Sequence, residues 1–204
     1  MVDFDAVAWG AGMVPLVVVL ILMRSRGWDW PHLAALSVFW LYAFGVVKVA
    51  FFAIPVSGSM AEAFASEGGS FWSTVNLVPG RFAGFETLAI KQSAYNVLMA
   101  LPFGFGLPFL VRVSWRRAAW SAVLFGTTIE CLQLLISLAI GFPYRVVDIN
   151  DLLFNGLGVI LGFALFRFLA RLVLAAEAGW DPSAEGRVAT YLVEVARRSS
   201  GAGS

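Results

Sequence analysis

Apolar residues form five long stretches along this chain, separated by short polar segments. The stretches cover residues 6–23, 33–54, 93–111, 118–140 and about 152–174. Each has roughly the 20 residues with which an α-helix crosses a hydrocarbon core of about 30 Å. The pattern therefore predicts an all-α membrane protein with five transmembrane helices.

A cleavable signal peptide is the alternative interpretation of the first stretch. Asp3 and Asp5 precede it, where a signal peptide carries basic residues, and Arg24-Ser25-Arg26 follows it, where small residues would mark a cleavage site. We therefore expect the first helix to be retained.

The C-terminal tail carries a different periodicity. Its apolar residues recur at i, i+3, i+4 and i+7, at Val188, Tyr191, Leu192 and Val195. Asp181-Pro182 offers an N-cap and a first-turn proline. The tail thus predicts an amphipathic helix lying at the membrane interface. We expect one transmembrane domain over residues 1–176, and a cytoplasmic amphipathic helix with a disordered end, GAGS, over residues 177–204.

Composition agrees with a membrane protein and narrows its partners to the lipid bilayer and molecules within it. The 204 residues are 60% hydrophobic and only 13% charged, and the mean hydropathy is +0.82. A net charge of +1 without basic runs excludes a nucleic-acid partner. The single cysteine, Cys131, cannot form an internal disulfide, and we expect it to pack against a neighbouring helix.

The distribution of basic residues predicts the orientation, because cytoplasmic flanks collect Lys and Arg. One side gathers ten of the fourteen Lys and Arg, from the loops that follow the first and third spans and from the C-terminal part of the chain. Only Arg81, Lys91 and Arg145 lie on the other side, and Lys48 lies within a span. We therefore expect the N-terminus outside, the C-terminus in the cytoplasm, and loops 55–92 and 141–151 outside.

With this orientation, polar residues of several spans share one depth range. Counting inward from the outer ends at about 1.5 Å per residue, the depths are roughly 5 Å for Asn96 and Asn155, 9 Å for Lys48, 10 Å for Gln133 and 15 Å for Glu130. Helical spacing places two sets on one face each: Thr127, Glu130, Gln133 and Ser137, and Asp151, Asn155, Gly158 and Gly162. We interpret Gly158 and Gly162 as a site of close helix packing.

Glu130 is the most informative single residue, because an ionised carboxylate near the bilayer centre costs at least ~2.5 kcal/mol. Three states would accommodate it: a neutral carboxyl, an ion pair with Lys48, or contact with a water-filled cleft open to the outside. If Glu130 has no functional role, the explanation would be a hydrogen bond from the protonated side chain to Gln133 or Asn96, which joins neighbouring helices. The sequence leaves these alternatives open.

Arg145, Asp148 and Asp151 lie in or near the second outer loop, where Asp148 or Asp151 could simply cap the fifth helix. Their spacing with Asn155 instead favours a site that continues down the helix. Arg81 and Arg145 would form a clamp for an anion. Asp148 and Asp151 are candidate ligands for a divalent cation, and no other cofactor is expected.

Several enzyme classes lack their components. His32 is the only histidine and falls on the predicted cytoplasmic side, so histidine-based triads and zinc sites are excluded near the cleft. The chain also has no P-loop or Rossmann glycine pattern.

An ordered series of residues between positions 76 and 162 resembles the VanZ-like family of bacterial membrane proteins. Its members are Asn76, Pro79, Asn96, Pro102, Gly104, Thr127, Thr128, Ile129, Glu130, Gln133, Arg145, Asp148, Asp151, Asn155 and Gly158. The patterns IExxQ and RxxDxxDxxxNxxG are the most specific part. Gly80 departs from the family, which usually carries an aromatic residue there, and Phe82 is a candidate substitute.

The resemblance implies a place in the bacterial cytoplasmic membrane and a role at the cell envelope. The family is named for a protein encoded beside glycopeptide-resistance genes and associated with reduced susceptibility to teicoplanin, and no agreed reaction comes with it. The resemblance also implies that the polar residues form a shared site.

These observations predict an outward-opening cleft that binds an amphiphilic envelope molecule, either a lipid-linked cell-wall intermediate or a lipidated glycopeptide. The expected cleft residues are Asn76, Arg81, Asn96, Glu130, Gln133, Arg145, Asp148, Asp151 and Asn155. Whether the protein is an enzyme stays open. The alternative to binding is an enzyme that acts on a lipid-linked substrate with Glu130 as general acid or base. A transporter ranks last, because no polar path continues to the inner half.

Overall fold

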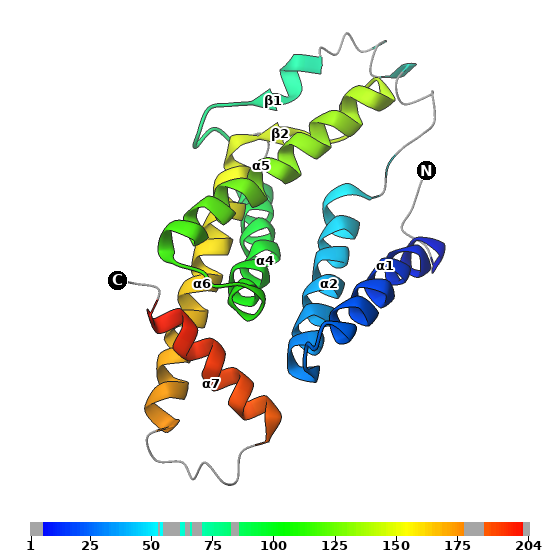
Figure 1. Cartoon of the computed structure of the whole chain (residues 1–204). Helices are drawn as coiled ribbons and strands as arrows, with labels where there is room; N and C mark the ends of the chain where they lie inside the picture. Colours follow the sequence, from blue (N-terminus) through cyan, green and yellow to red (C-terminus); the bar gives the residue numbers. More distant parts are fainter. Residues whose placement is uncertain are drawn as a thin grey trace.

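The computed structural model describes residues 6–52, 71–82, 86–177 and 186–201, together with the single positions 54, 62, 63 and 66. Within them the helices are α1 (Ala6–Ser25), α2 (Trp30–Phe51), α4 (Glu86–Leu110), α5 (Trp115–Ile140), α6 (Ile149–Glu177) and α7 (Arg187–Ser200) (Figure 1). Five of these helices, all but α7, are long and apolar enough to cross a membrane. The prediction of an all-α membrane protein with five spans is confirmed.

Helices α4 and α6 form the tightest pair in the described chain, because glycines remove the side chains between them. A Cβ built on Gly162 would lie 2.0 Å from the carbonyl oxygen of Leu101, and one on Gly104 would lie 1.9 Å from that of Val159. At Gly158 the corresponding distance to the Val97 oxygen is 2.4 Å. The packing interpretation of Gly158 and Gly162 therefore holds, and small residues here let two helix backbones approach closely.

Helices α5 and α2 complete the bundle around this pair. Gly126 of α5 faces the backbone of α6, where a Cβ would lie 2.9 Å from the Leu152 oxygen. Buried Ile129 of α5 packs with Val46 and Phe51 of α2. Ser114 caps the start of α5 by accepting a hydrogen bond from the Arg117 N–H, and Gly141, with φ +81°, ends it.

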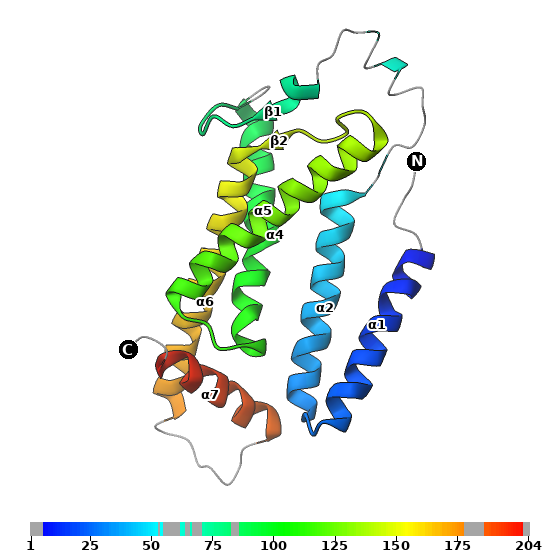
Figure 2. The same cartoon turned by 45° about the horizontal axis from the view of Figure 1, so that its top comes forward.

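Two loops join at one end of the bundle through a pair of very short strands (Figure 2). The strand β1 (Val75–Asn76) follows a 3₁₀ turn (Phe71–Thr74) and pairs in parallel with β2 (Val147–Asp148). The register places Val75 opposite Val147 and Asn76 opposite Asp148. The hydropathy pattern predicts no strand here, because two-residue strands carry no periodicity.

Helix α7 packs across the opposite end of the bundle. Tyr191 and Val195 of the predicted apolar stripe are buried against α4 and α6, whereas Val188 and Leu192 are exposed. The Tyr191 hydroxyl donates to the carbonyl of Phe109 at 2.8 Å. Burial raises the pKa of Tyr191 to about 12, so this hydroxyl stays a donor. Arg167 donates to the Ser199 carbonyl at the end of α7.

The amphipathic helix is thus present, beginning at Arg187 after the N-cap Gly186. The predicted cap Asp181-Pro182 lies outside the described residues, as do residues 202–204 of the GAGS end. The expectation for Cys131 is wrong: this residue is exposed on α5.

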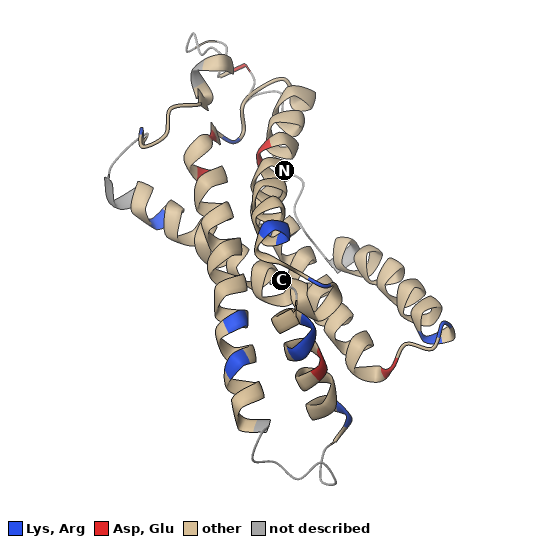
Figure 3. Cartoon of the chain, turned by 60° about the vertical axis from the view of Figure 1, so that its left-hand side comes forward, with Lys and Arg blue, Asp and Glu red and all other residues tan. Residues whose placement is uncertain are grey.

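The two ends of the bundle differ in charge (Figure 3). His32, near the α1–α2 turn, lies against Tyr191 of α7 with ring centroids 4.5 Å apart. The end of α4 also meets α7, through Phe109. The basic segments near these contacts, from the α1–α2 turn, the α4–α5 loop and α7, therefore share the end of the molecule opposite β1 and β2.

We predict that Gly162→Ala lowers the free energy of unfolding of the detergent-solubilised protein by about 1–3 kcal/mol, and its melting temperature with it. This range is typical of overpacking, and it applies here because the added methyl group would overlap a backbone carbonyl. Gly156→Ala on the same helix is the matched control, since its Cβ would meet Ala122 at an ordinary 3.8 Å. Equal melting temperatures for the two variants would contradict this description of the α4–α6 contact.

Candidate functional site

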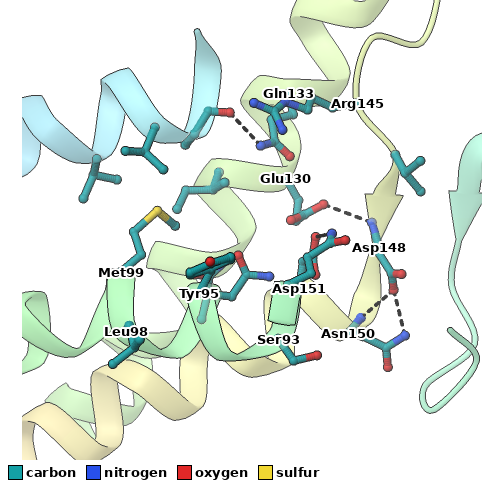
Figure 4. Close-up of a pocket in the computed structure, with 18 of the residues that line it drawn as sticks. Ser93, Tyr95, Leu98, Met99, Glu130, Gln133, Arg145, Asp148, Asn150 and Asp151 are labelled. Atoms are coloured by element: carbon teal, nitrogen blue, oxygen red, sulfur yellow. Dashed lines mark hydrogen bonds between the residues drawn. The ribbon is translucent and has the colours of Figure 1, made fainter. Parts of the chain in front are cut away.

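A pocket of about 1010 Å³ opens between α2, α4, α5, the loop before α6 and the first turns of α6 (Figure 4). This volume is at the upper end of the range typical of small-molecule sites. Its apolar wall is built by α2, α4 and α5, with Val46, Val49, Leu98, Met99, Pro102 and Ile129. Its polar side carries Gln92, Asn96, Glu130, Gln133, Asp148, Asp151 and Asn155. The pocket is therefore amphiphilic.

Glu130 lies on α5 with 6% of its surface exposed. Its Oε2 accepts a hydrogen bond of 3.1 Å from the backbone N–H of Asp148. This bond joins the middle of α5 to the start of α6, and it is neither of the two hydrogen bonds considered from the sequence. Among the described residues no ion pair joins Glu130 to Lys48, whose side chain is exposed. A backbone amide thus holds one carboxylate oxygen beside the pocket.

Gln133 lies one helical turn away and connects α5 to α2. Its Nε2 donates to the carbonyl of Ala50 at 2.9 Å, within the last turn of α2, where carbonyl groups lack helical partners. Ser137 donates to the Gln133 carbonyl at 2.9 Å. Glu130, Gln133 and Ser137 of the predicted polar face are buried, whereas Thr127 is exposed.

Asp148 caps α6, as one of the sequence alternatives proposed. Its Oδ1 accepts from the Asn150 backbone N–H at 2.8 Å and from Asn150 Nδ2 at 2.9 Å. Asn76 Nδ2 donates to the same oxygen at 2.9 Å. The side chain therefore holds the start of α6, strand β1 and strand β2 in one network, and Figure 4 shows its bonds to Asn150.

Asn150 extends this network to the turn at residues 78–81. The turn closes with a hydrogen bond from the Arg81 N–H to the Val78 carbonyl, and Gly80 adopts φ +79°, which a side chain would strain. Asn150 accepts from the Gly80 N–H at 2.8 Å and donates to the Arg81 carbonyl at 2.9 Å. The glycine that departs from the family pattern is thus required by this turn.

Asp151 faces α4 from the first turn of α6. Its Oδ2 accepts from Gln92 Nε2 at 2.8 Å. An acidic side chain in the first helical turn also complements the partial positive charge of the helix N-terminus. Asp151 therefore contributes to the pocket rim and to the α4–α6 contact.

Three buried side-chain atoms in the described part of the chain have no hydrogen-bond partner, and the residues that carry them all line the pocket. They are Asn96 Nδ2, Tyr144 Oη and Asn155 Oδ1. Asn155 has only 1% of its surface exposed. Burial raises the pKa of Tyr144, against the opposing effect of Arg145, so its hydroxyl is neutral and can donate or accept. Leaving such groups unpaired costs about 1–3 kcal/mol each.

The two candidate clamp arginines occupy different places. Arg145 lines the pocket and is exposed. Arg81 is exposed and does not line the pocket, and its contribution to the network is its backbone carbonyl. Asn76 likewise ties the loops together outside the pocket lining. Lys91 is the second basic residue at the pocket.

The carboxylates do not form a metal-binding group in the described chain. No set of three or more His, Cys, Asp or Glu side chains converges there as a metal site would require. One oxygen of Asp148 already accepts three N–H donors, and one of Asp151 accepts another. A divalent cation at Asp148 and Asp151 stays a prediction that these contacts do not favour.

Three residues of the site were not predicted from the sequence: Asn150, Gln92 and Tyr144. Asn150 stands between two acidic residues at a helix start, where an Asn residue commonly bonds to its own backbone, and this pattern is the only available signal. Gln92 and Tyr144 precede or follow the apolar spans and have no distinguishing spacing. Their roles depend on the tertiary arrangement.

Comparison with known sequences gives one result. The sequence model of the family described as VanZ/LLP1 matches residues 39–171, a range that includes α4, α5, most of α2 and α6, and the whole pocket. No curated protein and no solved structure matches the chain.

We predict that Asp148→Ala lowers the stability of the protein by about 1–2 kcal/mol, as the loss of a helix cap does, because Asn150 and Asn76 lose their shared acceptor. Thermal unfolding in detergent would measure this. Asp29→Ala is the control, because Asp29 also precedes a helix but makes no side-chain cap bond, and its one side-chain partner is His32 of the same helix rather than another element. A larger effect at Asp29 than at Asp148 would refute the network's role.

Proposed function

Because this chain belongs to the VanZ/LLP1 family, we propose that its pocket binds an amphiphilic molecule of the bacterial cell envelope. The candidates are a lipid-linked cell-wall intermediate and a lipidated glycopeptide such as teicoplanin, with a role in resistance to glycopeptide antibiotics. The observation that carries the proposal is a pocket with an apolar wall and a polar side, which matches a molecule with a chain and a headgroup.

The proposed location is the bacterial cytoplasmic membrane, with the pocket facing outward. Ten of fourteen Lys and Arg lie at the end of the molecule opposite β1 and β2, and such an excess is typical of the cytoplasmic side. The N-terminus would then lie outside and the C-terminus, with α7, in the cytoplasm.

In this arrangement, each part of the pocket has a distinct role. Val46, Val49 and Leu98 contact the apolar chain of the ligand. Arg145 at the rim holds an anionic group where the ligand has one. Asn96 and Asn155 hydrogen-bond the headgroup. Asp148 and Gln133 hold the surrounding backbone in place.

Glu130 is the reason to keep a second function, an enzyme acting on a lipid-linked envelope substrate. A carboxyl group that is 6% exposed, lines a pocket and has one oxygen fixed by an N–H is suited to proton transfer. Binding without turnover ranks first because the amphiphilic lining of the whole pocket supports it, whereas the enzyme rests on Glu130 alone.

The variant Glu130→Gln, which keeps the shape of the side chain, distinguishes the two functions. For a binding protein, the variant retains the ligand affinity within about threefold, less than 1 kcal/mol. Extracted envelope lipids, compared by mass spectrometry between cells that carry the native protein, the variant or neither, then show no new product. A product formed with the native protein and lost with Glu130→Gln would contradict the binding function and support the enzyme.

Cysteine labelling tests the orientation. In a Cys131→Ala background, a cysteine in place of Leu77, which is 71% exposed in the loop of β1, reacts with a membrane-impermeant maleimide on intact cells. A cysteine in place of exposed Arg112, in the α4–α5 loop, is the control and reacts only after permeabilisation. The reverse pattern would contradict the outward-facing pocket.

A further inference from the structure

The unpaired polar atoms of the pocket restrict the chemistry of its ligand. Asn155 offers an unpaired amide oxygen and Tyr144 an unpaired hydroxyl, and the Asn96 amide nitrogen, which lies near the Asp151 carboxyl, makes no well-formed hydrogen bond. These are one donor, one acceptor and one group that serves as either. A partner that satisfies them must both accept and donate hydrogen bonds, as a hydroxyl or amide group does and a fully ionised phosphate does not.

The charge of the pocket favours a neutral group at the same place. Glu130 and Asp148 are buried, at 6% and 8% exposure, and Asp151 is half-buried. Asp148 and Asp151 also act electrostatically on Glu130. The two basic residues of the lining, Lys91 and Arg145, are both exposed. The more buried charged groups of the lining are therefore acidic and the exposed ones are basic, so an anion is repelled from the neighbourhood of the buried carboxyl groups.

Because Asn155 is buried, leaving its side-chain carbonyl oxygen without a hydrogen-bond partner costs free energy. Asn155 is 99% buried on α6, one turn above Gly158, where α6 contacts the backbone of α4 at Val97. An apolar residue at such a place would avoid the cost of an unpaired carbonyl. An unpaired amide at this buried position thus serves something other than packing.

From these observations we infer that the part of the pocket lined by Asn96, Tyr144 and Asn155 is a subsite for a neutral, hydroxyl-bearing headgroup, of the kind that a glycosyl lipid carries. This inference rests on the proposed function, since it assigns the headgroup of the amphiphile. Arg145 stays at the rim, where it meets an anionic part of a larger ligand without entering the subsite.

Two amphiphiles with the same chain test the inference. The full chain is placed in phosphatidylcholine nanodiscs, and its melting temperature is followed with octyl β-glucoside or octyl phosphate, each below the concentration that disrupts the discs. Octyl glucoside stabilises the protein with an apparent Kd at least tenfold lower than that of octyl phosphate. Asn155→Leu removes this preference, and its melting temperature without ligand equals or exceeds that of the native protein, because an unpaired buried carbonyl is lost.

The contrary results have different meanings. If Asn155→Leu melts several degrees lower and keeps the full preference for the glucoside, Asn155 is a structural or water-bound residue and the subsite is refuted. If Asn155→Leu does not fold, Asn96→Leu replaces it in the same measurement: loss of the preference for the glucoside supports the subsite, and full retention of that preference refutes it. If octyl phosphate binds as well as the glucoside, the headgroup assignment fails while the amphiphile pocket stands. If neither compound shifts the melting temperature, the proposed function fails with it.

Discussion

The close contact between α4 and α6 is the constraint on which the rest of the structure depends. Gly104, Gly158 and Gly162 bring two backbones so near that a methyl group on any of them would overlap a carbonyl. Without a hydrophobic driving force between helices in lipid, such packing is a main source of association. It sets Asn155 against the helix that carries Asn96, and so brings two amides to one pocket.

A second constraint is the absence of water around backbone groups in the membrane. Helix ends that meet the bilayer need internal partners. Gln133 provides one for the end of α2, and Asp148 provides one for the start of α6. Glu130 then accepts the N–H of Asp148, so that the same polar residues both hold the helices and line the pocket. Three helices are thereby fixed around a space that stays open.

Much of this arrangement is readable from the sequence, because hydropathy defines the spans and helical spacing defines their polar faces. Glu130, Gln133 and Asn155 line one pocket as their spacing predicts. The loops are different, because a residue's place there depends on hydrogen bonds that have no periodicity. Arg81 therefore lies outside the pocket lining, while Asn150, which has no distinctive spacing, joins the loops. Which atoms stay unpaired depends on side-chain geometry, which no sequence pattern specifies.

The central claim is that the pocket holds an amphiphile, and blocking the pocket tests it most directly. Gly45 of α2 lines the pocket, and a Cβ there would meet nothing within 4 Å, so Gly45→Trp places an indole in the open space. Gly10→Trp on α1, equally free of contacts and outside the pocket lining, is the control. Native mass spectrometry of protein released from bacterial membranes should show a bound amphiphile with the native chain and with Gly10→Trp, and none with Gly45→Trp. The same bound species on all three would contradict the account.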